Sequence, residues 1–392
     1  MDQAKPAGGP ILTTYYKILL GFSAVGIVLI IWRFLAGLGA TTALSDGYPW
    51  GLWIAFDVVT GTAFACGGYA MALVVYIFNK GKYHPLIRPA ILTSALGYSV
   101  AGFSVMIDIG RPWTAWKLPI FVNRWNLNSA LLEVALCIMA YCVVLYIELL
   151  PAFLEKARDS KIEKLRNVAT KLLPIFDKAL IFIVALGMLL PTMHQSSLGT
   201  LMLLTGPRLH ALWNTPLVPF LFLITAFTMG YAIVVFESTF SSLALGRKVE
   251  FRILKPVQKI AAWGSLAFVI IRVGDVIFRG QIGLMFVFDT QGTMFWIENV
   301  LFVIPVLLLL SGTHNLGMLF RQAIVAAIAG AVYRFDTFLV AFNPDSGWHY
   351  FPSVPELFTT LGLVAIEIAI YAAVVKTFPI LSGISAAPSH AR

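Results

Sequence analysis

A few polar side chains stand inside long apolar stretches of this 392-residue sequence, and their types suit proton transfer and quinone binding. An ionisable group within a membrane-spanning segment is costly and is by default a candidate functional residue. An imidazole, carboxylates, a guanidinium and carboxamides can together hydrogen-bond both carbonyls of a quinone ring and deliver its two protons. We expect Glu133, His194 and Asp108 to handle the protons. We expect the headgroup pocket to be formed by Arg111, Asn128, Gln195, Ser196, Trp113 and Asp57.

A line of polar residues also runs along the predicted span that contains Glu133. From Glu133 to Glu148 there are 15 residues, and at roughly 100° per residue the two carboxylates return to within about 60° of one face. Tyr141 lies between them on that face, so Glu133, Tyr141 and Glu148 form a candidate proton path through the membrane. The alternative is that Glu148 only extends its carboxylate to the membrane interface. Glu237 and Glu367 offer other routes through their own spans.

The residues that usually hold redox cofactors are sparse. Cys66, Cys137 and Cys142 lie within predicted spans and form no CxxC or CxxxC pair, so we expect neither an iron–sulfur cluster nor a structural metal site. A membrane haem b needs two histidines on facing helices, and of the six histidines His194 alone lies well inside a span. We therefore predict no haem in this chain, and electrons must reach a bound quinone from a partner subunit.

The elements that position these residues are transmembrane helices. Hydrophobic residues make up 59% of the chain and charged residues 12%, and the mean hydropathy is +0.84. The apolar residues come in blocks of about 20, the length a helix needs to cross about 30 Å of hydrocarbon. We predict an all-α polytopic membrane protein with about ten transmembrane helices. The predicted spans are 15–37, 51–78, 86–108, 129–149, 178–200, 217–240, 257–278, 292–310, 318–340 and 355–379.

The distribution of basic residues predicts the orientation. One side of the predicted membrane carries Lys80, Lys82, Arg88, Lys156, Arg158, Lys161, Lys164, Arg166, Lys171, Arg247, Lys248, Arg252, Lys255 and Lys259. The other side carries only Arg111, Lys117, Arg124, Arg208 and Arg279. We predict a protein of the bacterial inner membrane with both termini, 1–14 and 381–392, in the cytoplasm. These loops explain the net charge of +9 without a nucleic acid partner. The connector 152–173 is expected to be an amphipathic helix on the membrane surface.

The single transmembrane domain, 15–380, contains an internal repeat. Phe64 and Phe227 are 163 residues apart, Gly110 and Gly274 are 164 apart, and Glu133 and Glu298 are 165 apart. Four spans separate the copies, so both have the same orientation. We predict two related four-helix bundles, about 51–200 and about 217–341, flanked by helices 15–37 and 355–379. In the second bundle we expect the nearby charges Arg272 with Asp275, and Arg334 with Asp336, to form pairs that hold helices together.

Several motifs resemble those of the NrfD/PsrC family. They are YPWGLWIAFD at 48–57, Phe64–Gly68, YHPL at 83–86 and DIGRP at 108–112. LPTMHQSS at 190–197 and AFNP at 341–344 resemble the HybB branch, the membrane subunits of quinone-linked periplasmic [NiFe] hydrogenases. The resemblance extends from about residue 45 to 380.

This resemblance implies a cofactor-free subunit in the lipid bilayer that passes electrons from a periplasmic iron–sulfur subunit, next to [NiFe] hydrogenase subunits, to menaquinone. It also implies a quinone site near the periplasmic face, and in such proteins the position of Glu133 is associated with proton movement. No activity is expected of the chain alone. Three alternatives remain: a quinone-linked anchor of another respiratory oxidoreductase, a secondary transporter, or a structural anchor without a quinone site.

Overall fold

The computed structural model describes residues 4–247, 251–312, 315–345 and 347–382. Within these ranges ten helical segments are long and apolar enough to cross a membrane, so the predicted all-α polytopic fold is confirmed. The segments are α1 (Thr14–Ala36), the irregular span Trp53–Ile77, η3 with α5 (Gly81–Asp108), α7 (Ala130–Arg158), the Lys178–Leu203 part of α8 (Glu163–Leu203), α9 (Val218–Ala244), α10 (Phe251–Phe278), α12 (Thr290–Leu310), α13 with η7 (Leu316–Val340) and α14 (Val354–Thr377). Lys248, His314, His390 and most of the predicted C-terminal tail lie outside the described residues.

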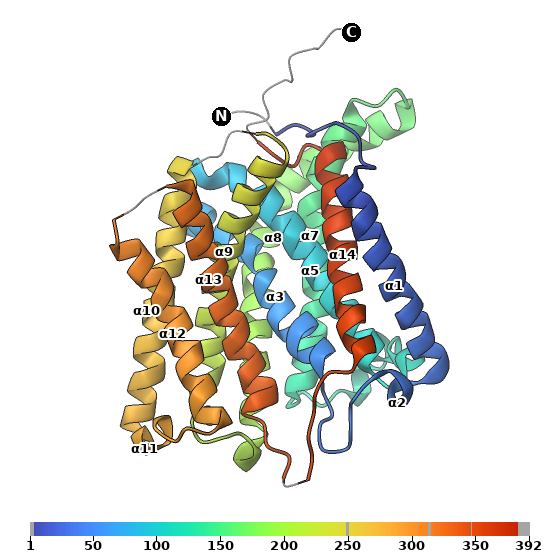
Figure 1. Ribbon diagram of the computed structural model, residues 1–392. Helices are drawn as coiled ribbons and strands as arrows, with labels where there is room; N and C mark the ends of the chain where they lie inside the picture. The colour runs from blue at the N-terminus through green and yellow to red at the C-terminus, as the bar shows by residue number, and fades with distance from the viewer. Residues whose placement is uncertain (1–3, 248–250, 313–314, 346, 383–392) are drawn as a thin grey trace.

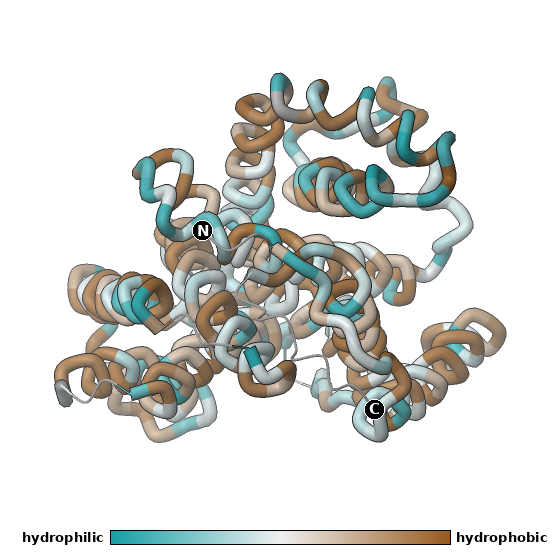
Figure 2. The backbone as a smooth tube through the Cα atoms, turned by 90° about the horizontal axis from the view of Figure 1, so that it is seen from above, coloured by the Kyte–Doolittle hydropathy of each residue, from teal (hydrophilic) through white to brown (hydrophobic). Residues whose placement is uncertain are grey.

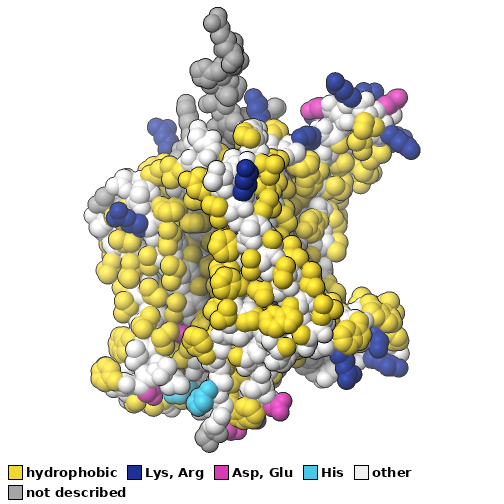
Figure 3. Space-filling model, turned by 45° about the vertical axis from the view of Figure 1, so that its right-hand side comes forward, with side chains coloured by type: hydrophobic (Ala, Val, Ile, Leu, Met, Phe, Trp, Pro, Cys, Tyr) yellow, Lys and Arg dark blue, Asp and Glu magenta, His cyan; other side chains and the backbone are white. Residues whose placement is uncertain are grey.

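The helices run roughly parallel to one another across the molecule (Figure 1). Seen along their axes, most of their length is hydrophobic (Figure 2). Apolar side chains point outward as well as inward; Leu35 and Ile181, for example, are 83% and 73% exposed. Hydrophobic side chains cover the middle of the molecule, while lysines and arginines gather near its two ends (Figure 3). This distribution suits a protein whose outer surface faces lipid.

The two ends of the described chain meet on one face, which we call the terminal face. Lys5 pairs with Leu381 through the backbone, and this face is at the top of Figure 1. The opposite face is called the distal face. α1 packs along α14 at Gly26 and Gly362, where a Cβ atom on either glycine would lie within 2.7 Å of the other backbone. Small residues allow such close helix contacts in membranes, where lipid and side chains are equally apolar.

Two helix groups lie between these outer helices and the far side of the molecule. The first group contains the irregular span, α5, α7 and α8, and the second contains α9, α10, α12 and α13. They meet where Gly67 and Gly230, from the predicted repeat, face each other: a Cβ atom on Gly230 would lie 2.8 Å from the Cys66 carbonyl oxygen. Because α8 also packs against α9, the division into two related bundles stays a proposal.

The irregular span changes helix type several times. π-helices η1 (Trp53–Thr60) and η2 (Leu73–Ile77) enclose α3 (Gly61–Phe64) and α4 (Gly67–Ala72), with a turn at Ala65 and Cys66. π-helical turns and breaks leave backbone groups that need other partners inside a membrane. Arg334 supplies one such partner, because its Nη1 donates to the Val59 carbonyl at 2.9 Å.

The terminal-face connector differs from the prediction. Residues 152–173 do not form a separate surface helix, because α7 continues to Arg158 and α8 begins at Glu163. Prolines 151 and 174 lie inside these helices without ending them. The two helices therefore extend past the apolar layer as a charged projection, at the upper right of Figure 1. The remaining short elements are α2 (Leu38–Thr41), η3 (Gly81–Leu86), η4 (Pro112–Thr114), α6 (Lys117–Ile120), η5 (Val122–Arg124), η6 (Gly206–Arg208), α11 (Ile282–Met285) and η7 (Asp336–Val340).

Candidate functional site

A fully buried hydrogen-bond network joins three helices of the first group. Thr62 of α3 donates its hydroxyl to the Val58 carbonyl at 2.7 Å. The same oxygen lies 3.1 Å from Gln195 Nε2 and 3.3 Å from His194 Nε2, both on α8. Gln195 Nε2 also donates to the Tyr98 hydroxyl of α5 at 3.3 Å. His194 and Gln195 are both 0% exposed.

Two buried atoms of this network, His194 Nδ1 and Gln195 Oε1, have no partner at hydrogen-bonding geometry in the described part of the chain, although the Val134 backbone lies close to the His194 ring. Buried polar atoms of this kind need a partner such as a water molecule or a transferred proton. Thr62 also has two possible acceptors for its single hydroxyl proton, the Val58 carbonyl and His194 Nε2. Rotating that hydroxyl towards His194 would leave the imidazole proton on Nδ1. The geometry therefore allows the imidazole to exchange between its two tautomers.

Tyr141 of α7 packs against this network through a ring contact. Its ring packs edge-on against the Tyr98 ring, with centroids 4.6 Å apart, and is fully buried. Glu133 and Glu148 lie on either side of it along α7, about 12 and 10 Å away at 1.5 Å per residue. Glu148 lies against α8, where a Cβ atom on Gly187 would be 2.6 Å from its Oε1. The predicted path residues therefore occupy three depths of one helix beside the buried network.

The other residues predicted to form the pocket lie outside this network. Some are exposed at the distal face, and the Ser196 hydroxyl bonds within its own helix. Arg111 and Asn128 are exposed, and Trp113 is 68% exposed. Glu133 is half-buried. Ser196 donates to the carbonyls of Thr192 and Met193 in its own helix. The structure thus brings His194 and Gln195 together with Tyr141, whereas Arg111, Trp113 and Asn128 belong to an open surface.

Asp57 and Asp108 face the α1–α14 side of the molecule. Asp57, 4% exposed on η1, accepts a hydrogen bond from Thr360 of α14 at 2.9 Å. Asp108 ends α5, and its buried Oδ1 has no hydrogen-bond partner among the described residues. Arg33 of α1 lies nearby and donates to the carbonyls of Ile107 and Ile109 at 2.5 and 2.7 Å. Sequence reasoning missed Arg33, although a guanidinium inside an apolar span was signal enough to find it.

The predicted charge pairs of the second helix group are wrong in both cases. Arg272 pairs with Glu298 of α12 at 3.0 Å, and both side chains are 0% exposed. Asp275 pairs instead with Arg279 at 2.9 Å, one turn away on the same helix. The rotation of α10 about its axis directs Arg272 towards Glu298 of α12. Asp275, three residues further along, therefore pairs with Arg279 of its own helix.

Arg334 and Asp336 also have separate surroundings. The Arg334 guanidinium donates to the carbonyls of Val59 and Phe222 and to the Thr225 hydroxyl. Asp336 begins the π-helix η7, is 0% exposed and has no hydrogen-bond partner on either carboxylate oxygen within the described ranges. It interacts electrostatically with Glu298 and Arg272. The second group therefore contains two carboxyl groups and one guanidinium in a fully buried cluster.

The distal face carries an open groove of about 390 Å³ in the loop after α5. It is lined by Lys117, Leu118, Phe121, Arg124 and Trp125. Basic and apolar side chains lie next to each other at the lower right of Figure 3, and Ile120 and Trp116 of the same loop are 65% and 55% exposed. Such a surface suits contact with another protein or with lipid headgroups.

His210 lies in the distal loop before α9, outside the membrane spans. Burial lowers the pKa of the imidazole below its ordinary value of 6.5, against an opposing effect of Asp289. Its unprotonated Nδ1 accepts the Leu212 backbone N–H at 3.3 Å. The Leu212 carbonyl in turn accepts a hydrogen bond from Arg272 at 2.5 Å. Neutral His210 thus fixes the loop that covers the Arg272–Glu298 pair.

These features define a class: a multi-pass membrane protein with an ionisable, hydrogen-bonded interior and, among its described residues, no cluster of metal ligands. The chain belongs to the NrfD family, since residues 40–342 match the family described as "Polysulphide reductase, NrfD". The resemblance inferred from the motifs is confirmed.

Three relatives have informative names. The chain is 40% identical, over 96% of its length and 95% of the relative, to the "Probable Ni/Fe-hydrogenase 2 b-type cytochrome subunit" of Escherichia coli (strain K12). It is 32% identical to the "Menaquinone reductase, integral membrane subunit" of Nitratidesulfovibrio vulgaris, over 62% of this chain and 58% of the relative. It is 23% identical to one of the selenate reductase subunits of Mesobacillus selenatarsenatis, over 94% of both chains. Its relatives are thus membrane subunits of redox complexes.

The name of the first relative mentions a b-type cytochrome, which implies haem. The described histidines do not provide a facing pair for it. His84 precedes α5 on the terminal face, while His210 and His349 lie in distal loops. His194 is inside the first group, but its ring is enclosed by Thr62, Val134 and Tyr98. This donor set does not fit a haem held between two helices.

Proposed function

We propose that this chain is the electron-transfer membrane subunit of a hydrogenase-type respiratory complex. It passes electrons from a periplasmic iron–sulfur subunit to menaquinone bound near the distal face. The observation that carries the proposal is the buried network of Thr62, His194, Gln195 and Tyr98 beside Glu133 and Tyr141, because quinone reduction consumes two protons for every two electrons. The names of the hydrogenase and menaquinone reductase relatives support the donor and the acceptor.

We assign the terminal face to the cytoplasm and the distal face to the periplasm of a bacterial inner membrane. The charged projection formed by α7 and α8 and the loop around Lys80 lie on the terminal face, which supports this orientation under the positive-inside rule. The groove at Lys117 and Arg124 is then available to a periplasmic partner. In this arrangement the partner docks over the loop 111–128, where Arg111, Trp113 and Asn128 are exposed.

Protons for the quinone come through the first helix group in this proposal. Glu148 takes up a proton on the cytoplasmic side, Tyr141 and the His194 network relay it, and Glu133 donates it near the quinone. The tautomer exchange that Thr62 permits gives His194 a way to pass a proton without becoming a buried cation. In this proposal Gln195 and Ser196 border the quinone site from α8, while Asp57 and Asp108 border it from the side that faces α1 and α14.

The test uses the assembled complex in its native membrane. Hydrogen-dependent reduction of a menaquinone analogue is measured for Glu133→Gln and for Glu155→Gln, a carboxylate on the same helix at the terminal face. Loss of a general acid typically costs about 100-fold or more in rate, so Glu133→Gln should fall by that factor while Glu155→Gln stays near wild type. Hydrogen-dependent reduction of a soluble dye by the peripheral subunits should be unchanged in both, which controls for assembly.

Full quinone-linked activity in Glu133→Gln would remove the proton role of this residue. A wild-type complex that reduces the quinone only with a donor other than hydrogen would favour another respiratory oxidoreductase, a class that includes the selenate reductase relative.

A secondary transporter remains a second candidate because one span is broken near its middle, at Ala65 and Cys66. Transporters usually have such breaks in both repeats, whereas α9, the repeat counterpart of this span, is continuous. Solute uptake into vesicles that contain the purified chain alone, without any redox partner, would favour the transporter.

A further inference from the structure

Two helices of the second group carry buried polar residues at the same spacing. Gln258 and Arg272 on α10 are 14 residues apart, and so are Gln322 and Asp336 on α13 and η7. At 3.6 residues per turn, two residues 14 apart lie within about 40° of one another around the helix and about 21 Å apart along it. All four are at most 3% exposed. Each helix therefore presents an amide towards the terminal face and an ionisable group towards the distal face, on one side of the helix.

Most of these side chains have atoms without hydrogen-bond partners in the part of the chain that the structure describes. Both amide atoms of Gln258, Nε2 of Gln322 and both oxygens of Asp336 are buried and unpartnered. Thr228 Oγ1 and Asn299 Oδ1, on α9 and α12 of the same group, are also unpartnered. Folded proteins leave few such atoms, and ordered water is their usual partner. The unpartnered atoms come from all four helices of the group, so each helix carries a buried polar atom that a bound water could satisfy.

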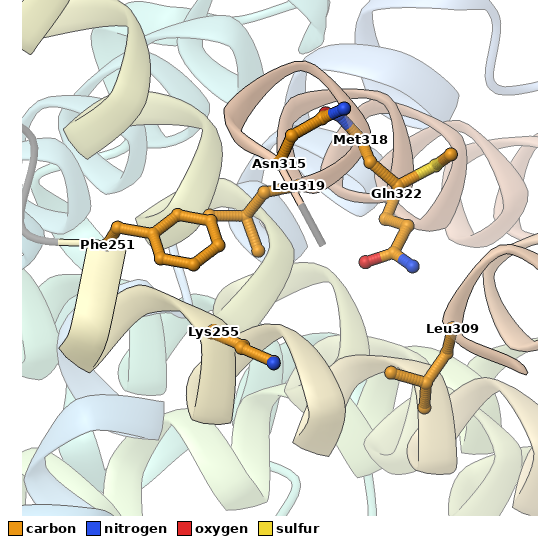
Figure 4. A pocket seen from close by; sticks show the side chains of 7 residues that line it. All are labelled: Phe251, Lys255, Leu309, Asn315, Met318, Leu319 and Gln322. Atoms are coloured by element: carbon orange, nitrogen blue, oxygen red, sulfur yellow. The ribbon is translucent and has the colours of Figure 1, made fainter. Parts of the chain in front are cut away.

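At the terminal end of these buried polar residues there is a small cavity between α10, α12 and α13. Its volume is about 10 Å³, room for about one water molecule, and its lining includes Lys255, Asn315 and Gln322. Figure 4 shows the Gln322 amide projecting from α13 into the space between Lys255 and Leu309. Water can thus meet the first buried amide close to the terminal face.

The distal end is the cluster of Arg272, Glu298 and Asp336. Arg272 and Glu298 neutralise each other at 3.0 Å, and Trp213 Nε1 donates to the other Glu298 oxygen at 3.2 Å. A second, uncompensated negative charge in this fully buried position, away from bulk solvent, would be very costly. One of the two carboxyl groups therefore carries a proton, and the partnerless Asp336 is the group without a fixed hydrogen bond to hold it ionised.

We propose that the second helix group contains a file of bound water that carries protons between the terminal face and the carboxyl groups of Asp336 and Glu298. A proton enters from water at Gln322, passes Gln258, Thr228 and Asn299 by exchange along hydrogen-bonded water, and ends on a carboxylate oxygen. When the proton leaves along the same water file, the carboxyl group returns to its starting protonation state, so no other reactant is needed. The file is separate from the Glu133–Tyr141–Glu148 path and does not depend on the identity of the electron donor.

The test measures the protonated carboxyl group directly, on purified protein in lipid nanodiscs, by time-resolved infrared spectroscopy after transfer to D2O. The wild type should have a carboxylic acid band that shifts in D2O and disappears in Asp336→Asn or in Glu298→Gln. Gln322→Leu and Gln258→Leu keep the side-chain size but replace the hydrated path by apolar surface, so each should slow the band shift by about tenfold or more. Glu148→Gln, in the other path, should leave the rate of exchange at this band unchanged.

Either of two results would overturn the proposal. One is the absence of any carboxylic acid band that depends on Asp336 or Glu298. The other is an exchange rate that neither glutamine replacement alters, or that Glu148→Gln slows as much as they do. Because the measurement needs neither hydrogenase nor quinone, its outcome is independent of the proposed redox function.

Discussion

The fully buried pair of Arg272 and Glu298 allows a quantitative test of what holds the second helix group together. We replace Glu298 by glutamine, which preserves the shape of the side chain and removes its charge. The Arg272 guanidinium would then lose a partner whose carboxylate oxygen lies 3.0 Å from both Nε and Nη2. Both side chains are 0% exposed, so bulk solvent cannot screen the charge left on Arg272.

Breaking a buried ion pair from one side typically costs about 3–5 kcal/mol, because it leaves an uncompensated charge. Two features place Glu298→Gln near the lower end of that range. Arg272 still donates to the Leu212 carbonyl and stacks near the rings of Trp213 and Phe295. Asp336 can also ionise beside Arg272 and restore part of the neutrality. The double variant Glu298→Gln/Asp336→Asn removes that compensation and should be less stable than Glu298→Gln alone.

The assay follows unfolding through the buried cysteines. Cys66 and Cys137 are buried and Cys142 is half-buried, so a thiol-reactive fluorophore labels them as the protein opens. The matched control is Glu155→Gln, which breaks the Arg88–Glu155 pair at the terminal face, where both side chains are about one-third exposed. An ion pair in that position contributes at most about 1 kcal/mol. A third variant, Arg272→Met/Glu298→Gln, removes both charges and should recover most of the lost stability.

Equal decreases of the unfolding midpoint in Glu298→Gln and Glu155→Gln would contradict a penalty from the buried charge. A further loss of stability when Arg272 is also replaced by methionine would contradict it too, because the penalty would then not come from an unpaired buried charge.

Three further predictions concern separate parts of the structure. In the buried network, His194→Phe keeps an aromatic ring against Tyr98 but removes both ring nitrogens, and quinone-linked activity of the complex should fall by at least about tenfold while the chain still assembles. At the contact between the helix groups, Gly230→Val would place a Cβ atom 2.8 Å from the Cys66 carbonyl oxygen and should abolish accumulation of folded protein in the membrane. Gly274→Val, on α10, meets nothing within 4 Å and should accumulate normally. For His210, burial lowers the pKa below 6.5, so below about pH 6.5 the unfolded chain binds a proton that the folded protein excludes, and stability falls as the pH drops. His210→Asn should remove that part of the acid destabilisation in the same unfolding assay, and an unchanged pH profile would contradict it.

Local sequence was sufficient to predict where the helices are. An apolar block such as the one in α9 has no other stable form in lipid, because every backbone N–H and C=O must be bonded within the segment. Basic loops such as Lys80–Arg88 predicted which ends share a face. The connector 152–173 was mispredicted because its charge suggested a surface helix, whereas continuous helix formation through Pro151 and Pro174 extends α7 and α8 beyond the apolar layer.

The composition of the interior was also readable from the sequence, but the partners were not. A buried histidine or carboxylate is recognisable by its type and its apolar surroundings. Whether Arg272 bonds to Asp275 or to Glu298 depends on how α10 and α12 rotate against each other, and residues 26 positions apart leave no local trace of that choice. The same holds for Thr62, an ordinary small residue in sequence that becomes a shared partner of His194 and Gln195 only when α3 packs against α8. Sequence determined which polar groups must be inside this protein, because their positions within apolar spans are local. Tertiary packing decided which of them meet, because hydrogen bonds between helices require rotations and depths that no single helix specifies.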